Sequence, residues 1–293
     1  MKQSKQVFPI QIDKLKVYYL VSDYSLINQL MELTTDNDCL YVTSFQFRRT
    51  KKNVFIVNNQ TSDSWEVYAT LHINTVCDIQ FQETTVKGVW VSYENKTLYD
   101  GRFEKLYALL RNSVHLQFNN ITTIELAVDS TFSINKLAYT NLRNKELETI
   151  LNGKVIDRNS KLDLYFHSIT TANRVVEHYI QVENKDYKHN SKHKGMALKT
   201  YNKLDEIAAN NYEKQYILDK YNFPDKLFRL EITVTGEAAM EYVNRYRVEC
   251  EKLFFNSDQL QVMFFTHINR LLRWRKGRTI IKWEDLIATA GVR

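Results

Sequence analysis

Residues 121–129 read Ile-Thr-Thr-Ile-Glu-Leu-Ala-Val-Asp, and the alternation of apolar and polar side chains is typical of a β-strand. Successive side chains of a strand point to opposite faces, so the apolar residues at positions 124, 126 and 128 share one face. Glu125 and Asp129 lie on the other. We therefore expect a strand that packs its apolar face in the core and projects two carboxylates from the opposite face.

Two later segments have the same pattern. Residues 195–203 end in Leu-Lys-Thr-Tyr-Asn-Lys, and residues 227–234 read Leu-Phe-Arg-Leu-Glu-Ile-Thr-Val. If the three predicted strands are neighbours with their apolar faces aligned, the opposite face gathers one tyrosine and six charged residues: Glu125, Asp129, Lys199, Tyr201, Lys203, Arg229 and Glu231. The alternative is an ordinary amphipathic sheet whose wet face carries solvated charges and cross-strand ion pairs.

The remaining pattern predicts an α+β protein with an antiparallel-rich sheet and flanking helices. Strand-like segments dominate the first hundred residues, whereas helical periodicity marks 101–114, 133–147 and 204–221. Beyond Gly236 the sequence predicts helices at 237–255, 257–275 and 283–290. We expect one α+β domain over residues 1–236 and a helical C-terminal module over residues 237–293. Residues 1–85 form a β-rich lobe that either recognises DNA or only extends the sheet.

Composition limits the classes of function. The 293 residues carry a formal charge of +6, and 13% are aromatic, which suits a surface that holds phosphates and stacks bases. Cys39, Cys77 and Cys250 are too few and too scattered for a disulfide framework. No run of residues is apolar enough to span a membrane, and the N-terminus has no apolar signal segment, so we expect a cytoplasmic protein. Walker, GxGxxG and GxSxG motifs are absent, which excludes common classes of nucleotide-dependent and hydrolytic enzyme.

The charged face has the groups that DNA strand transfer needs. A tyrosine oxygen can attack phosphorus and hold one DNA end covalently. Carboxylates can bind Mg²⁺ or Mn²⁺, which prefer oxygen ligands, and such a cation offsets the charge on the leaving 3′ oxygen. Lysine and arginine can contact the non-bridging phosphate oxygens.

The order of these segments resembles a known family. Ile-Glu-Leu-Ala-Val-Asp129, Leu-Lys-Thr-Tyr201-Asn-Lys203 and Phe-Arg229-Leu-Glu231-Ile together are similar to the replication initiators of rolling-circle plasmids and to phage gene II/X-type replication proteins. The segment Val91-Ser-Tyr-Glu-Asn-Lys-Thr-Leu-Tyr99 adds to the resemblance, which covers about residues 85–255. Many initiators use a His-hydrophobic-His pair for their metal; this chain has none, so the resemblance points to the subtype that lacks it.

The resemblance implies an endonuclease that nicks and rejoins one DNA strand at an origin through a phosphotyrosine intermediate. Tyr201 would be the nucleophile, and Lys203 and Arg229 would bind the scissile phosphate. Asp129, Glu231 and Glu125 would hold Mg²⁺ or Mn²⁺. The alternatives are a mobilisation relaxase and a non-catalytic DNA-binding replication or copy-control protein.

Basic residues outside this face are candidates for DNA contacts. The segment 269–278 holds five of them, and His189 and His193 lie in a polar, basic stretch. The expected partner is single-stranded or melted origin DNA; a host helicase and a second copy of the chain are further expected partners. The full set of predicted DNA-binding residues is Lys199, His189, His193, Arg270, Arg273, Arg275, Lys276 and Arg278.

Overall fold

The structure is a computed structural model that describes residues 5–35, 38–59, 66–78, 83–156, 164–171, 174–183, 195–210 and 213–292. It confirms the expected α+β class, with antiparallel strand pairs and flanking helices. Among the described residues, no helix is both long and apolar enough to cross a membrane.

The chain divides into two compact units whose boundaries fall inside two long strands. Unit 2 comprises Asp13–Ile124, and unit 1 comprises Met1–Ile12 together with Glu125–Arg293. The strands β1 (Gln11–Val21) and β7 (Leu116–Ser130) therefore each contribute to both units. The division expected from the sequence, with a C-terminal module over residues 237–293, stays a prediction.

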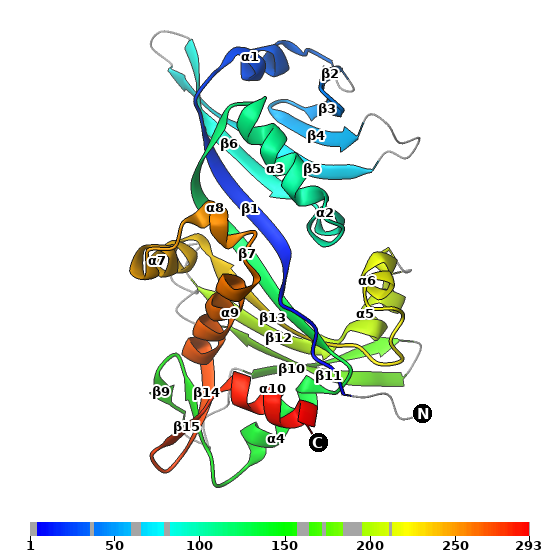
Figure 1. Cartoon of the computed structure of the whole chain (residues 1–293), viewed down its shortest axis with the longest axis vertical. Coiled ribbons are helices and arrows are strands. Elements are labelled where there is room, and N and C mark those ends of the chain that lie inside the picture. The colour runs from blue at the N-terminus through cyan, green and yellow to red at the C-terminus, as the bar shows by residue number, and fades with distance from the viewer. Residues whose placement is uncertain are drawn as a thin grey trace. The chain divides into compact units, whose positions relative to one another are not determined.

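Unit 2 is a sheet with helices on one face. Its strands follow the order β7-β1-β6-β5-β4-β3-β2, and the neighbouring strands from β1 through β2 pair antiparallel. Helix α3 lies across one face of this sheet (Figure 1). On that face the ring centroids of Phe103 and Tyr93 are 4.9 Å apart, and those of Tyr107 and Tyr19 are 6.5 Å apart. The elements of this unit are α1 (Ser25–Glu32), β2 (Cys39–Val42), β3 (Phe45–Lys51), β4 (Val54–Asn59), β5 (Val67–Asp78), β6 (Glu83–Tyr93), α2 (Asn95–Tyr99) and α3 (Arg102–Asn112).

Unit 1 contains the strands that carry the candidate site. Its main sheet has the order β10-β11-β12-β13-β7, and β15-β14-β8-β9 form a second, smaller sheet. Apolar side chains of β7, β12 and β13, among them Leu126, Leu198 and Ile232, are fully buried. The strands are β8 (Glu148–Leu151), β9 (Lys154–Val155), β10 (Leu164–Thr171), β11 (Arg174–Glu183), β12 (Met196–Asn202), β13 (Phe228–Thr235), β14 (Leu272–Lys276) and β15 (Thr279–Ile281).

The helices of unit 1 are shorter than the sequence predicts, because local signals end them. The segment 204–221 forms two helices, and Arg247, in the left-handed conformation, ends the helix that begins at Gly236. The helices are α4 (Ile134–Arg143), α5 (Lys203–Ala209), α6 (Gln215–Lys220), α7 (Gly236–Tyr246), α8 (Cys250–Leu253), α9 (Ser257–Leu271) and α10 (Trp283–Val292).

The C-terminal region is not purely helical. Helix α9 ends at Leu271, and residues 272–281 form the β14–β15 hairpin with Gly277 and Arg278 at its turn. Strand β14 also pairs with β8, which lies far earlier in the sequence. This long-range pairing explains why the basic segment 272–276 forms a strand. Its backbone hydrogen bonds go to β8, and the local sequence gives no sign of that distant partner.

Candidate active site

The three predicted strands are neighbours, as the shared-face argument required. Strand β13 lies between β12 and β7. In the register of β12 and β13, Tyr201 faces Arg229 and Lys199 faces Glu231 across the two strands. Residues that pair directly across antiparallel strands project from the same face, so the four side chains share one surface.

Tyr201 and Glu231 form the central contact of this surface. The Tyr201 hydroxyl donates a hydrogen bond to Glu231 Oε2 at 2.9 Å. The other carboxylate oxygen of Glu231 lies 3.8 Å from Nζ of Lys199, whose side chain is 37% exposed. The phenol proton therefore already points at a carboxylate, which is the geometry that a general base requires.

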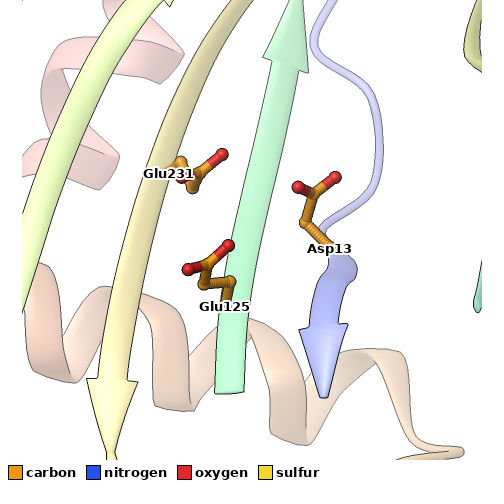
Figure 2. Close-up of side chains that lie close together, drawn as sticks. All are labelled: Asp13, Glu125 and Glu231. Carbon is orange, nitrogen blue, oxygen red and sulfur yellow. The ribbon is translucent and has the colours of Figure 1, made fainter. Parts of the chain in front are cut away.

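A second carboxylate stands beside Glu231. Thr233 Oγ1 donates a hydrogen bond to Glu125 Oε1 at 3.1 Å, which fixes the Glu125 side chain on the same face. Asp13, at the start of unit 2, is oriented by a 2.7 Å hydrogen bond from the Tyr99 hydroxyl to its Oδ1. Glu125, Glu231 and Asp13 each offer a carboxylate oxygen, and these oxygens all lie within 4.8 Å of one another (Figure 2).

This donor set fits a hard divalent cation. Carboxylate oxygens are the ligands that Mg²⁺, Mn²⁺ and Ca²⁺ prefer. Three like charges at this spacing, two of them on buried residues, repel one another, and a cation would relieve that repulsion. The acidic group can therefore hold a metal ion; it includes Glu125 and Glu231 of the predicted ligands, and it adds Asp13.

Asp129 and Arg229 are engaged with each other. Arg229 Nε donates to Asp129 Oδ1 at 2.8 Å, and its Nη2 donates to Oδ2 at 2.7 Å. The two residues are 0% and 1% exposed. A buried bidentate pair of this kind satisfies both ionic groups and is costly to break. The roles expected for Asp129 toward metal and for Arg229 toward phosphate stay predictions, while the observed contact is between the two side chains.

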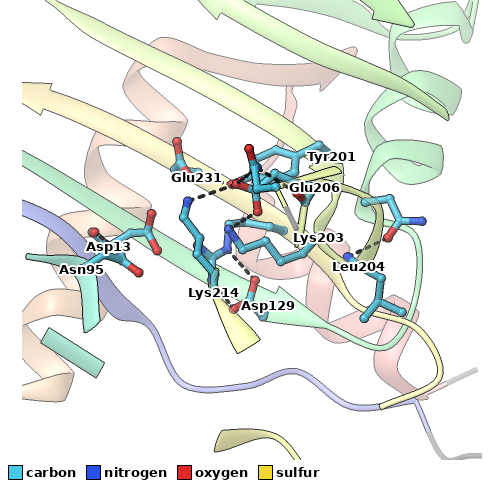
Figure 3. A network of polar contacts seen from close by, with 12 residues as sticks. Asp13, Asn95, Asp129, Tyr201, Lys203, Leu204, Glu206, Lys214 and Glu231 are labelled. Carbon is cyan, nitrogen blue, oxygen red and sulfur yellow. Dashed lines mark hydrogen bonds and ion pairs between the residues drawn. The ribbon is translucent and has the colours of Figure 1, made fainter. Parts of the chain in front are cut away.

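Lys203 lies beneath the Tyr201 ring. Asn202 caps helix α5 by accepting a hydrogen bond from the backbone N–H of Leu204, and this cap places Lys203 in the first turn. Its fully buried Nζ is 5.5 Å from the centroid of the Tyr201 ring and 2.7 Å from Glu206 Oε2 (Figure 3). The cation is therefore placed to stabilise negative charge that develops on the phenol.

Glu206 is shared by two lysines. Its other oxygen lies 3.0 Å from Nζ of Lys214. Burial raises the pKa of the Glu206 carboxyl, but the charges of Lys203 and Lys214 outweigh that effect and hold the pKa below its ordinary value. Glu206 therefore stays ionised and fixes both ammonium groups.

The other predicted DNA-binding residues lie on different parts of the chain. His189 and His193 lie outside the described residues. Arg270 at the end of α9 pairs with Glu241, while Arg275 and Lys276 of β14 pair with Glu148 and Glu146. Arg273 is partly exposed on β14, and Arg278 is exposed at the hairpin turn. Their contacts with DNA stay predictions.

Sequence reasoning missed Asp13 and Lys214 as members of the site, whereas Glu206 is close enough to Tyr201 in the sequence to be a candidate. A signal for Asp13 is present in β1: residues 15, 17 and 19 are apolar and buried, and Asp13 occupies the same alternation. An acidic side chain in register with a buried apolar row requires polar partners, and Tyr99 is one of them.

Comparison with known proteins gives a fold-level match. No protein-family model matches the sequence, and no curated protein matches it significantly. The fold is similar to that of a rolling circle replication initiator protein from Geobacillus stearothermophilus. The match has a TM-score of 0.50 and 13% sequence identity, and it covers 98% of this chain and 97% of that chain. At this identity the likeness describes the fold, and neither a helicase partner nor a homodimer gains support from it.

Proposed function

We propose that this protein is a replication initiator of the rolling-circle type, which nicks and rejoins one strand of origin DNA through Tyr201. The observation that carries the proposal is the 2.9 Å hydrogen bond from the Tyr201 hydroxyl to Glu231, a carboxylate within reach of Glu125 and Asp13. The whole-chain similarity to a rolling circle replication initiator supports the same reading.

In the proposed reaction, Tyr201 Oη attacks the phosphorus atom of one phosphodiester. Its proton passes to the Glu231 carboxylate, which already accepts the hydrogen bond. A bond forms between Oη and phosphorus, and the bond between phosphorus and the 3′ oxygen breaks. The upstream strand leaves with a 3′ hydroxyl after protonation by solvent, and the downstream strand stays on Tyr201 through its 5′ phosphate. Attack by a 3′ hydroxyl reverses these steps and rejoins the ends.

The other residues have supporting roles in this scheme. Lys203 stabilises the phenolate that forms when Tyr201 loses its proton, because its buried ammonium lies against the ring. Lys199 is half exposed beside Glu231 and can contact a non-bridging phosphate oxygen. Glu125, Glu231 and Asp13 would hold Mg²⁺ or Mn²⁺, and a bound cation would offset charge on the phosphate and the leaving oxygen.

Asp129 and Arg229 enter this proposal as a structural pair. Their mutual bidentate contact ties β7 to β13, and those strands carry Glu125 and Glu231. The pair would position the carboxylates rather than bind metal or DNA.

The test is covalent capture of DNA. A randomised single-stranded oligonucleotide library with a 3′ fluorescent label is incubated with the protein and Mn²⁺, and the mixture is separated in denaturing gel. We expect a labelled protein band that requires Mn²⁺, is absent in EDTA and is lost in Tyr201→Phe. Tyr216→Phe, a change of another tyrosine in the same unit, is the control and should leave the band intact. Binding without any covalent band in Mn²⁺ would identify a non-catalytic DNA-binding protein instead.

A further inference from the structure

The sheet of unit 2 has a second face, opposite the one that α3 covers. Along β1, the buried residues Leu15, Val17 and Tyr19 alternate with side chains that are partly or fully exposed. The same alternation continues on β6, where Val89 and Val91 are buried while Trp90 and Ser92 are partly exposed. The strands thus present one row of side chains to α3 and another to the opposite side.

Three aromatic rings form a continuous row on this opposite face. Tyr18 pairs with Trp90 across β1 and β6, and Trp90 pairs with His72 across β6 and β5. The ring centroids of Tyr18 and Trp90 are 5.0 Å apart, and those of His72 and Trp90 are 5.7 Å apart. Tyr18 and Trp90 are partly exposed, and His72 is exposed. We refer to Tyr18, Trp90 and His72 as the aromatic row.

Gly88 leaves room for the Tyr18 ring of the aromatic row. Gly88 lies two residues before Trp90, and a Cβ atom at this position would come within 2.6 Å of the Tyr18 hydroxyl oxygen. The absence of a side chain therefore lets the Tyr18 ring lie across β6. Asn74 Nδ2 donates a hydrogen bond to the Tyr18 hydroxyl at 3.4 Å, which helps to hold the ring there.

The charge of this face is positive. Lys16 lies two residues from Tyr18 on β1, and Arg48 occupies the same face of β3, next to Ile56 of β4. The charged residues at the outward positions of β1 and β3 are Lys14, Lys16, Arg48 and Lys51, and all four are basic. An occupant that carries negative charge and flat apolar groups would match this combination.

We propose that the aromatic row binds single-stranded DNA by stacking unpaired bases on its rings while Lys16 and Arg48 contact the phosphates. Every base has a π-face, so stacking of this kind tolerates different sequences, and basic residues beside it follow the backbone. Duplex DNA fits less well, because its bases are already stacked and a flat sheet does not enter the major groove. This surface for unpaired DNA lies in unit 2, and binding there does not depend on Tyr201 being the nucleophile.

The experiment measures binding in EDTA, so that no cleavage takes place. The full chain is titrated into a fluorescent oligothymidine of twelve nucleotides, and fluorescence anisotropy gives the dissociation constant. We expect Trp90→Ala to weaken binding by about five- to a hundredfold, the range for loss of one stacked base. Trp90→Phe keeps a ring and should stay within about threefold of wild type. Phe255→Ala removes an exposed aromatic side chain of unit 1 and should have no effect.

Further measurements separate stacking from misfolding. A backbone of the same length without bases should bind weakly, and Trp90→Ala should not weaken it further. Tyr18→Ala should reproduce the effect of Trp90→Ala, with circular dichroism spectra that match wild type for both variants.

Equal affinity of wild type, Trp90→Ala and Tyr18→Ala for oligothymidine would overturn the proposal. The proposal would also be overturned if Trp90→Ala left the DNA affinity unaltered and changed the sedimentation of the protein alone. That result would show that a protein, and not DNA, binds this face. Failure of covalent capture at Tyr201, with the Trp90 effect intact, would count against the nicking activity and not against this surface.

Discussion

Replacing Asp129 with Asn tests whether this carboxylate is a structural partner or a metal ligand. The change keeps the shape of the side chain and removes the charge that faces Arg229 at 2.7–2.8 Å. Removing one partner of a buried ion pair costs about 3–5 kcal/mol, because the other charge is left uncompensated. For a chain of this size that loss corresponds to a fall in Tm of roughly 6–20 °C.

Glu125→Gln is the matched comparison. It removes the charge of another carboxylate on the same strand, and its expected effect on Tm in EDTA is the opposite of that of Asp129→Asn. Glu125 and Glu231 oxygens lie within 4.8 Å, and two unit charges at that distance repel by about 3.5 kcal/mol at an effective dielectric of 20. In EDTA, loss of one charge should therefore raise Tm or leave it unchanged. The Thr233 hydroxyl can still donate to the amide oxygen of Gln, so the local packing is kept.

The assay is thermal unfolding of wild type and both variants, each in EDTA and in excess Mn²⁺. Asp129→Asn should be destabilised in both conditions and keep the increase in Tm that Mn²⁺ causes. Glu125→Gln should lose most of that increase. If Asp129→Asn instead unfolds like wild type in EDTA and no longer responds to Mn²⁺, Asp129 is a metal ligand and not a structural partner of Arg229.

Three further predictions concern residues of unit 1. Lys203→Met should slow covalent capture in a single-turnover time course by at least about tenfold, because a unit charge 5.5 Å from the ring contributes on the order of 3 kcal/mol at an effective dielectric of 20; capture at the wild-type rate would contradict this. Burial lowers the pKa of His267 from 6.5 to about 4, so the unfolded chain binds a proton that the folded chain does not, and stability should fall as pH drops from 6.5 to 4. Chemical denaturation should show that His267→Leu removes up to about 3 kcal/mol of this pH dependence, and an unchanged slope would be evidence against a neutral buried imidazole. Arg278→Ala at the exposed hairpin turn should reduce the salt dependence of DNA binding by about one phosphate contact, and an unaltered salt slope in a binding titration would remove this residue from the DNA surface.

The alternation of residues along the strands predicted the active face, because the face on which a strand residue lies depends only on whether its position is odd or even. Arg229 and Glu231 share the face of Tyr201, as the pattern predicts, although both side chains are buried rather than exposed to solvent. Parity does not report how far each side chain reaches. The alternation therefore placed Asp129 and Glu125 on one surface but did not show that Asp129 forms an ion pair with Arg229.

The features that the sequence did not indicate depend on distant partners. Asp13 lies more than a hundred residues from Glu125, and its place is set by the course of β1. The β14–β15 hairpin was predicted as helix, because Leu271, Leu272 and Trp274 fit a helical spacing as well as an alternating one. Pairing with β8 decides between the two, and no local pattern contains that information.

The most direct measurement of the central claim is the site of covalent attachment. The captured complex is digested with a protease and a nuclease, and mass spectrometry locates the peptide that carries the residual nucleotide. We expect a 5′ phosphonucleotide on Tyr201, in the peptide that spans β12 and the start of α5. A nucleotide on a different residue, or capture of equal yield by Tyr201→Phe, would contradict it.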